Sequence, residues 1–537
     1  MRRVSLALVA VLAAALLVSA TTVAKPKPKP QKGSSTNTSK LRKAVTVDGI
    51  LAHQRAFQQI ANQNGGNRAA NTPGYDASVK YVSGRLRRAG YSVKLDPFDF
   101  PRYTQNSPTV FEQKSPNART YVEGTDFMTA EFSGAGDVEK AVVPAGNTAI
   151  PPPGGPGTST SGCAASDYPA STAGNVSLIQ RGTCTFTEKA RLAKEAGAAA
   201  VVIFNDGFPG RTDPIAIGAP PFIGIPVVMS SSAIGEELYN AARAGGATVR
   251  IKTDTTTTPD TEYNVIADSK HGDPNRTIVV GAHLDSVDEG PGINDNGSGS
   301  SSNLEIAEEI AELRGAKPRH RLRFAFWGAE EAGLVGSTAY VNGLSPRQLS
   351  KISMNLNFDM VGSPNFVRFV YDGDTSDTPP PAGGAPPGSG RIEDEFNGFF
   401  RSQGLETDPT AFDGRSDYGP FIAAGIPAGG LFSGAEGIKT AEQAAVYGGT
   451  AGTPFDPCYH QACDTIANLN PTALSQFSDA AAHTSWFFAN SKKPLVGEAG
   501  ARKSRAAKAR RAKSAKGKTT AKRRLARQAK KGHLAYR

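Results

Sequence analysis

Cysteine is scarce in this sequence of 537 residues, which contains only Cys163, Cys184, Cys458 and Cys463. Neither close pair has the CxxC spacing common in zinc–thiolate sites, which weighs against such a site. The spacing instead favours the disulfides Cys163–Cys184 and Cys458–Cys463, although four cysteines allow three pairings. Disulfides form in oxidising compartments, so these pairs fit an exported protein.

Long apolar runs are missing beyond the N-terminus. No stretch after residue 24 reaches the roughly 18 apolar residues that span a bilayer. No cysteine follows the first apolar run to accept a lipid. Residues 1–24 combine Arg2 and Arg3 with an apolar run and small residues near Ala20 and Ala24, which predicts a cleaved signal peptide. We therefore expect a secreted, extracellular protein without a transmembrane segment.

Acidic residues are absent from both ends of the chain. Residues 1–43 hold 9 Lys/Arg and residues 501–537 hold 16, which leaves 35 basic against 49 acidic residues between them. The central part is therefore acidic, with a net charge of −14, although the whole chain carries +11. Export argues against nucleic acid as the partner of the basic tail and favours an anionic cell envelope. A disordered tail that is clipped after secretion explains the same composition.

The residue composition and the hydrophobic pattern change several times along the chain. Residues 25–43 are rich in Lys, Pro, Ser and Thr, which predicts a disordered linker. From residue 261, apolar strand-like runs alternate with helical spacing and stop at polar clusters, which predicts a mixed, mainly parallel α/β sheet with helices on both faces. The expected division is a main α/β domain over 44–136 and 256–492, a small β-rich α+β insert over 137–255, and a disordered basic tail over 493–537.

The insert carries a recognisable central stretch, GNVSLIQRGTCTFTEKARLAKEAGAAAVVIFND. This stretch resembles the signature of the protease-associated domain over most of its length. The resemblance implies a module without chemistry of its own that shapes substrate access. A purely structural packing module is the alternative.

Polar clusters follow the apolar runs of the main domain, where strands of a parallel sheet would end. They bring together two imidazoles and several carboxylates: His283, Asp285, Asp295, Glu330, Glu331, Asp359 and His460. A mixed nitrogen and oxygen set suits zinc, and a bridging carboxylate can hold two ions. One glutamate of the pair can bind metal while its neighbour takes a proton from water. The remaining histidines are expected to be structural: His53, His271, His320, His483 and His533.

Seven motifs in residues 261–490 resemble the secreted co-catalytic di-zinc aminopeptidases of the aminopeptidase Y and bacterial leucine aminopeptidase type: GAHLDSV, GINDNGSG, FAFWGAEEAGLVGS, NFDMVGS, GRSDYGPF, GGTAGTPFDPCYHQACDTI and SDAAAH. The resemblance implies two Zn²⁺ ions per chain, one held by His283 and Asp359, the other by Glu331 and His460, with Asp295 bridging. Glu330 would then be the general base. Asp285 would orient the imidazole of His283, and Tyr459 would donate to the oxyanion.

The same resemblance suggests how substrate is selected. Asp413 and Arg415, in the loop DGRSD, would contact the free amino end, although a simple loop ion pair is the alternative. A further acidic residue of the family falls on Pro409, and Asp408 could replace it only if the loop shifts. Met360 and Phe432 would line an apolar pocket for large hydrophobic N-terminal residues, or belong to the core.

Calcium binds some relatives through two carboxylates near the C-terminal helix. Only Asp479 matches here, because Ser475 replaces the other carboxylate, which argues against calcium dependence. A Cys458–Cys463 bridge would pin the loop that carries Tyr459 and His460.

Several alternatives remain at this point. A carboxypeptidase of the same superfamily would need basic residues for a terminal carboxylate, and Arg415 is the only candidate. A glutaminyl-cyclase-like enzyme would hold a single zinc ion. A non-catalytic peptide-binding relative has no chemical reason to keep every ligand and Glu330. We expect a monomer that acts on peptide or protein substrates.

Overall fold

The computed structural model describes residues 37–208, 210–215, 223–313, 315, 317–381 and 384–492. The expected signal peptide, most of the expected linker and the basic tail lie outside these residues. None of the described helices has both the length and the apolar character needed to cross a bilayer.

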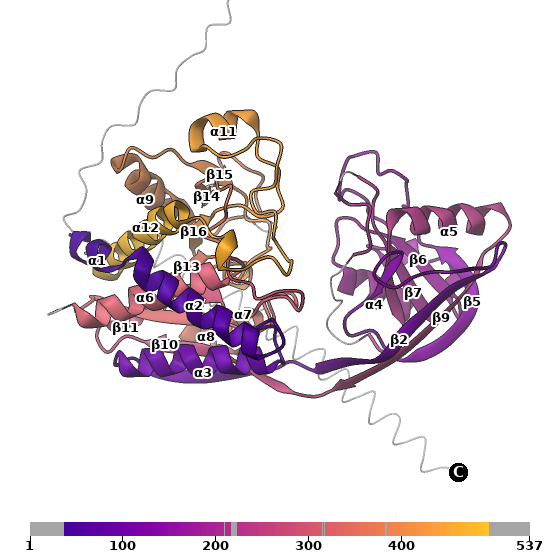
Figure 1. Ribbon diagram of the computed structural model, residues 1–537, viewed down its shortest axis with the longest axis horizontal. Helices are drawn as coiled ribbons and strands as arrows, with labels where there is room; N and C mark the ends of the chain where they lie inside the picture. Colours follow the sequence, from indigo (N-terminus) through magenta and orange to yellow (C-terminus); the bar gives the residue numbers. More distant parts are fainter. Residues whose placement is uncertain are drawn as a thin grey trace, which may run out of the picture. The chain divides into compact units, whose positions relative to one another are not determined.

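The first sheet has eight strands and a parallel centre (Figure 1). β11 pairs in parallel with both β12 and β13, and β13 pairs in parallel with β16, so four neighbouring strands end at one edge. In spatial order the strands are β1 (Ser92–Asp99), β10 (Thr261–Asp268), β12 (His320–Trp327), β11 (Asp273–His283), β13 (Ile352–Phe358), β16 (Ala428–Phe432), β14 (Phe369–Tyr371) and β15 (Asp408–Thr410).

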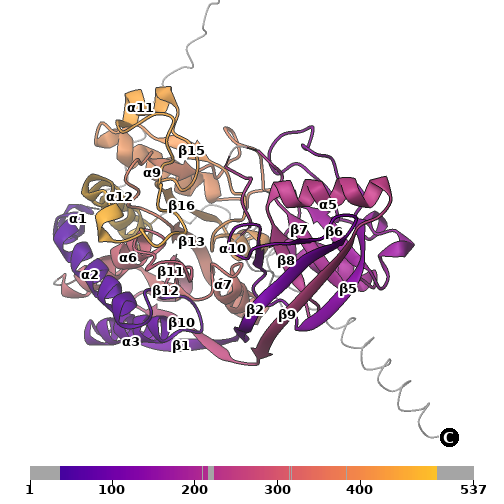
Figure 2. The same cartoon turned by 45° about the vertical axis from the view of Figure 1, so that its right-hand side comes forward.

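Helices cover both faces of this sheet, so its central strands are buried on both sides (Figure 2). In β10, for example, Val265 and Ala267 face one core while Ile266 faces the other. The first core is closed by α1 (Ser39–Ala44), α2 (Val47–Gln63), α3 (Pro73–Arg88), α6 (Gly297–Glu312), α9 (Ser389–Ser402) and α12 (Pro471–Asn490). The second is closed by α7 (Val335–Gly343), α8 (Pro346–Leu349) and α10 (Gly419–Ala423). The expected fold class is confirmed.

Local sequence signals set where the early helices begin. The side chain of Thr46 accepts the Gly49 N–H at the start of α2, and Thr72 caps α3 ahead of Pro73. α11 (Ala441–Tyr447) starts with a capping box between Thr440 and Gln443. The last short turn is the 3₁₀ helix Ile466–Asn468.

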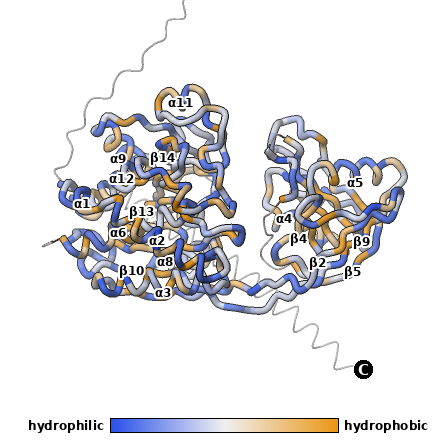
Figure 3. The backbone as a smooth tube through the Cα atoms, viewed as in Figure 1, coloured by the Kyte–Doolittle hydropathy of each residue, from blue (hydrophilic) through white to orange (hydrophobic). Residues whose placement is uncertain are grey.

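The insert builds a second eight-stranded sheet with its own cores. Its central strands are buried, and the hydropathy colouring of Figure 3 shows apolar residues gathered in this interior. The strands are β3 (Arg119–Thr120), β2 (Arg102–Ser115), β9 (Thr248–Thr258), β5 (Gly136–Pro144), β6 (Val176–Gln180), β7 (Ala200–Phe204), β8 (Val227–Ser230) and β4 (Phe127–Thr129). α4 (Phe186–Glu195) packs on one core and α5 (Ser232–Ala244) on the other, and the short helices Ala165–Asp167 and Ala170–Thr172 complete the insert.

Two expected boundaries differ from the structure. The second sheet already begins at Arg102, because β2 pairs along β9, so residues 102–129 do not belong with the rest of 44–136. The expected linker over 25–43 also reaches too far. Residues from Ser39 onward form α1, where Leu41 is buried and Arg42 pairs with Asp479.

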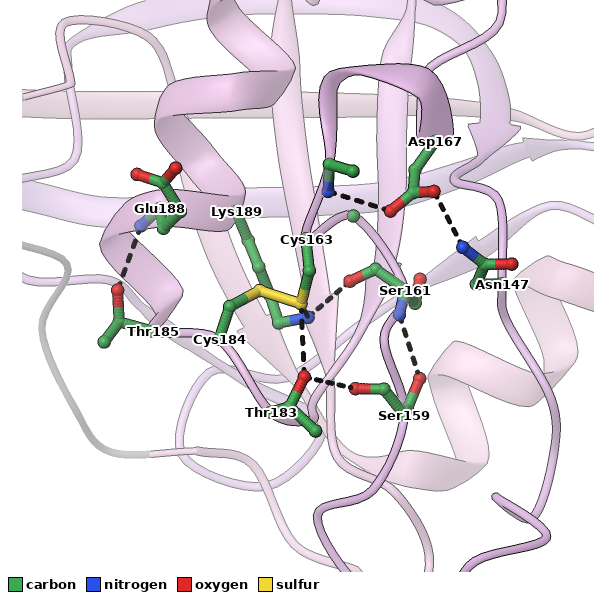
Figure 4. Close-up of a disulfide and its surroundings, with 12 residues drawn as sticks. Asn147, Ser159, Ser161, Cys163, Asp167, Thr183, Cys184, Thr185, Glu188 and Lys189 are labelled. Carbon is green, nitrogen blue, oxygen red and sulfur yellow. Dashed lines mark hydrogen bonds between the residues drawn. A yellow bond between two sulfur atoms is a disulfide. The ribbon is translucent and has the colours of Figure 1, made fainter. Parts of the chain in front are cut away.

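Both expected disulfides are present, and Figure 4 shows the one in the insert, Cys163–Cys184. The buried Lys189 of α4 donates to the Ser161 carbonyl, and its Nζ lies 3.6 Å from the Cys163 sulfur. Burial lowers the pKa of Lys189 to about 8, although Asp167 acts in the opposite direction. The bridge therefore joins the loop of Cys163 to the segment just before α4, and the buried ammonium of Lys189 lies against it.

Removing this bridge should destabilise the insert. The disulfide spans 21 residues, so the Cys163→Ala, Cys184→Ala double variant should lose about 3 kcal/mol of unfolding free energy. Urea unfolding followed by circular dichroism measures the loss, with Cys458→Ala, Cys463→Ala as the matched control on a shorter loop. An unchanged unfolding midpoint would show that the bridge adds no stability.

Candidate metal centre

Five side chains that can bind metal gather at one edge of the first sheet, where three neighbouring parallel strands end. His283 ends β11, Asp359 follows β13, and Glu331 follows β12 after one turn. Asp295 precedes α6, and His460 comes from the loop closed by the second disulfide. The ends of parallel strands meet at one edge of a sheet, which is why residues so far apart in sequence converge.

His283 and two carboxylates form the first half of the centre. Its Nε2 lies 3.2 Å from Oδ1 of Asp295 and 3.2 Å from Oδ1 of Asp359. The ligand atoms of these three residues all lie within 4.8 Å of one another. One nitrogen and two oxygens on a common focus make a site that a divalent ion can occupy.

His460 forms the second half with Glu331 and the other oxygen of Asp295. Its Nε2 lies 3.0 Å from Oε2 of Glu331 and 3.2 Å from Oδ2 of Asp295. The ligand atoms of this group also lie within 4.8 Å of one another. Asp295 thus offers one oxygen to each half, which is the arrangement of a bridging ligand.

The centre fits a pair of cations. Among the described residues, Oε1 of Glu331 is buried and has no hydrogen-bond partner, so this oxygen is free to bind an ion. Burial opposes a charged imidazole, yet Glu331 and Asp295 raise the pKa of His460 to about 11. Burial and Asp295 likewise raise the pKa of Glu331 to about 7. Bound cations would neutralise this concentration of buried negative charge.

Backbone contacts hold the ligands in place. Asp464 accepts the backbone N–H groups of Asn294 and Asp295 at 2.9 and 3.0 Å, which fixes the bridging carboxylate. The side chain of Asn296 bonds to the Phe358 carbonyl beside Asp359. These contacts tie the two loops to each other and orient the ligands.

Asp285 was expected to orient the His283 imidazole through its carboxylate, but its backbone carbonyl lies closer to the ring. Nδ1 of His283 lies 3.1 Å from the backbone carbonyl of Asp285 and 3.6 Å from its carboxylate. The carboxylate also accepts the backbone N–H groups of Glu330 and Glu331, each at 3.2 Å. One residue therefore sets both the imidazole and the glutamate pair.

Three supporting residues were not predicted as site residues. Ser416 donates its hydroxyl to Oδ2 of Asp359 at 2.5 Å, and Asp464 holds the Asp295 loop. Arg68, fully buried, donates to the carbonyls of Leu284, Pro291 and Gly292. Ser416 and Asp464 lie inside motifs that identified the family, GRSDYGPF and PCYHQACD, so the signal was present there. Arg68 lies in no motif.

Glu330 lies beside the ligands and faces the cavity over the centre. Its Oε2 is 4.0 Å from Nε2 of His283, and the side chain is buried. Burial raises the pKa of Glu330 well above its usual value, although His283 acts in the opposite direction. A carboxyl with a raised pKa can accept and return a proton near neutral pH.

The cavity also contains the side chains that were expected to select substrate. Its lining includes Met360, Asp413, Arg415, Phe432 and Tyr459. Met360 is buried, and Phe432 stacks on Phe369 at its edge. The cavity thus has an apolar wall and a polar wall.

The alternative of an ion pair between Asp413 and Arg415 is wrong. The guanidinium of Arg415 pairs with Glu436 at 2.8 Å, while Asp413 accepts the Tyr418 hydroxyl at 2.7 Å. Asp413 touches Arg415 only through the Arg415 backbone N–H.

Asp408 does not replace the missing acidic residue at Pro409. Its two oxygens accept from Tyr447 at 2.7 Å and from Gln443 at 3.0 Å, both on α11. The carboxylate is therefore occupied away from the cavity lining.

Three other described histidines, His53, His320 and His483, make structural contacts, while His271 is exposed. His53 bonds to Tyr81, His320 to the Ser491 carbonyl, and His483 to Thr38 and Glu395. Asp479, the possible calcium residue, accepts both guanidinium contacts from Arg42 at 2.7 Å.

Comparison with known proteins agrees with this geometry. Residues 264–485 match the model of Peptidase family M28, and residues 140–238 match that of the PA domain. The chain is 46% identical over 470 residues to an aminopeptidase of Pseudomonas aeruginosa, covering 84% of this chain and 83% of that one. It is 44% identical over 332 residues to leucine aminopeptidase 2 of Trichophyton rubrum, covering 62% of this chain and 66% of that one. The solved structure of a zinc aminopeptidase from Bacillus subtilis superposes with a TM-score of 0.56 at 25% identity, covering 84% of this chain and 95% of the other.

The Asp464 contacts generate a prediction about metal affinity. Asp464→Ala removes the acceptor for two backbone N–H groups that fix Asp295, so zinc affinity should fall by about 10- to 100-fold. Competition against a chromophoric chelator measures the change, and Asp479→Asn, an acid outside the centre, serves as control. Unchanged zinc affinity in a folded Asp464→Ala protein would contradict this role.

Proposed function

The chain belongs to peptidase family M28, and we propose that it is a secreted aminopeptidase in which two zinc ions and Glu330 activate water against N-terminal peptide bonds. Its metalloaminopeptidase class follows from the family match and from 46% identity to the Pseudomonas aeruginosa aminopeptidase over most of both chains. The number of ions, the mechanism, the substrate preference and the export are the proposed parts.

The shared carboxylate of Asp295 is the observation that carries the proposal. His283 and Asp359 would hold one ion, Glu331 and His460 the other, and each half uses a different oxygen of Asp295. A site for one ion would need only one of these halves. When bound, the ions supply an acidified water and polarise the scissile carbonyl.

Glu330 has the position of the general base. It lies buried at the wall of the cavity, beside the ligands. From there its carboxylate can take the proton of the attacking water and return it to the leaving amine. Tyr459, on the same cavity, can donate its hydroxyl to the oxyanion of the tetrahedral intermediate.

Substrate selection is proposed from the two walls of the cavity. Met360 and Phe432 offer an apolar surface to a large hydrophobic first side chain, in keeping with the name of the Trichophyton rubrum relative. Asp413 provides negative charge for the free α-amino group. Arg415 is already neutralised by Glu436, which leaves no unpaired cation among the described cavity residues for a C-terminal carboxylate.

Export is proposed from the signal-like residues 1–24 and from the two disulfides. Contact of the basic tail with an anionic envelope, and a monomeric state, remain predictions from the sequence.

Replacing the proposed base should separate catalysis from metal binding. Glu330→Gln keeps the shape of the side chain and the five ligands, so both zinc ions should remain while kcat falls at least about 10³-fold. Metal analysis and steady-state hydrolysis of leucyl-p-nitroanilide measure the two effects, with Glu442→Gln on exposed α11 as control. An active variant, or one inactive through zinc loss, would remove this role from Glu330.

Metal removal and restoration test the function as a whole. A chelated enzyme should lose leucyl-p-nitroanilide hydrolysis and recover fully at two Zn²⁺ per chain, because each half of the centre needs an ion. N-acetyl-leucyl-p-nitroanilide should resist cleavage throughout. Recovery complete at one ion would favour a mononuclear enzyme, and equal cleavage of the blocked substrate would exclude aminopeptidase selectivity.

A further inference from the structure

Arg415 lies between two oxygen-bearing side chains at the rim of the cavity. Its Nη1 contacts Oε1 of Glu436 at 2.8 Å, and its Nη2 donates to the hydroxyl oxygen of Tyr459 at 3.3 Å. The guanidinium is planar and rigid, so its contact with one partner fixes the direction of its other N–H groups. Glu436 thereby determines whether Arg415 can reach Tyr459.

The segment that carries Glu436 is tied to the Tyr459 loop on both sides. The carbonyl of Ala435 accepts the Asp456 N–H at 2.9 Å, and the carbonyl of Gly437 accepts the Phe455 N–H at 2.9 Å. The Cys458–Cys463 disulfide closes the same loop just beyond. Glu436 and Tyr459 are therefore held in fixed register, and Arg415 bridges them from a third segment.

The charges in this group suit such an arrangement. Partial desolvation would raise the pKa of Glu436, but Arg415 holds it below its usual value, so the carboxylate is ionised. Asp413, two residues before Arg415, accepts the Tyr418 hydroxyl instead. Glu436 is thus the carboxylate paired with Arg415 among the described residues.

We propose that Glu436 is a positioning residue for Tyr459, acting through Arg415. Glu436 holds the guanidinium so that Nη2 donates to the hydroxyl oxygen of Tyr459. The Tyr459 hydroxyl then accepts one hydrogen bond and keeps its own proton for the oxyanion. A phenol that accepts from a cation is a stronger donor, because hydrogen bonds in a chain polarise one another.

This inference rests on the proposed function, because it assigns Tyr459 to the oxyanion. It predicts an effect on catalysis with little effect on folding. The side chains of Arg415 and Glu436 are 57% and 55% exposed, and an ion pair of that exposure contributes little to stability.

Kinetics of Glu436 variants in the zinc-loaded enzyme test whether Glu436 positions Tyr459 through Arg415. Glu436→Gln should lower kcat for leucyl-p-nitroanilide about tenfold with KM nearly unchanged, since the interaction acts in the transition state. Glu436→Asp should recover part of the loss. Glu442→Gln, a second exposed acid, should leave both constants unchanged.

Double-mutant cycles identify the route. In a Tyr459→Phe background, and separately in an Arg415→Ala background, Glu436→Gln should cause no further loss. The second background keeps the test decisive if Tyr459→Phe is too slow to measure. Zinc content and unfolding midpoint confirm that each variant is intact.

Three results would overturn the proposal: a rise in KM alone, which would place Glu436 on the substrate; no change in kcat; or the same loss in both backgrounds. The wild-type assay separates these from failure of the proposed function. If wild type shows no zinc-dependent hydrolysis, the function fails, whereas failure of the positioning role leaves wild-type activity intact.

Discussion

The structure depends on one buried carboxylate that serves two halves of a metal centre. Asp295 offers one oxygen toward His283 and the other toward His460. Burial opposes a charged imidazole at His460, yet Glu331 and Asp295, at 3.0 and 3.2 Å, raise its pKa. The fold tolerates this charge because Asp464, Asp285 and Ser416 fix the ligands through hydrogen bonds that leave the ion-facing atoms free.

The sheet explains why the centre can be this precise. β11, β12 and β13 are central, parallel and buried on both faces, so the ends that deliver His283, Glu331 and Asp359 have little freedom to move. His460 comes instead from a loop, and there the disulfide and a stack on Tyr459 at 3.8 Å supply the rigidity. Buried strands hold three of the ligands rigidly, and a disulfide-closed loop does the same for His460.

Sequence alone was enough to identify the fold class and the residues that converge at the sheet edge. The apolar runs mark the strands, the polar clusters mark where they end, and histidines and carboxylates are distinctive as metal ligands. It placed the start of the insert too late, because β2 is long and largely polar, and its membership of the second sheet is visible only through pairing with β9. The alternative in which Arg415 pairs with Asp413, two residues away in the sequence, also fails. The true partner, Glu436, comes from another loop, and only tertiary packing brings the two together.

The attachment of the insert has a consequence for how such a protein could have arisen. The chain leaves the first sheet after Asp99 and returns at Thr261, two residues that face each other across β1 and β10, and Arg102 faces Thr258 just beyond. Departure and return are therefore neighbours on one antiparallel ribbon. A tight hairpin could replace the whole insert without shifting the register of the host sheet, so an ancestor could have gained or lost this module in a single recombination event.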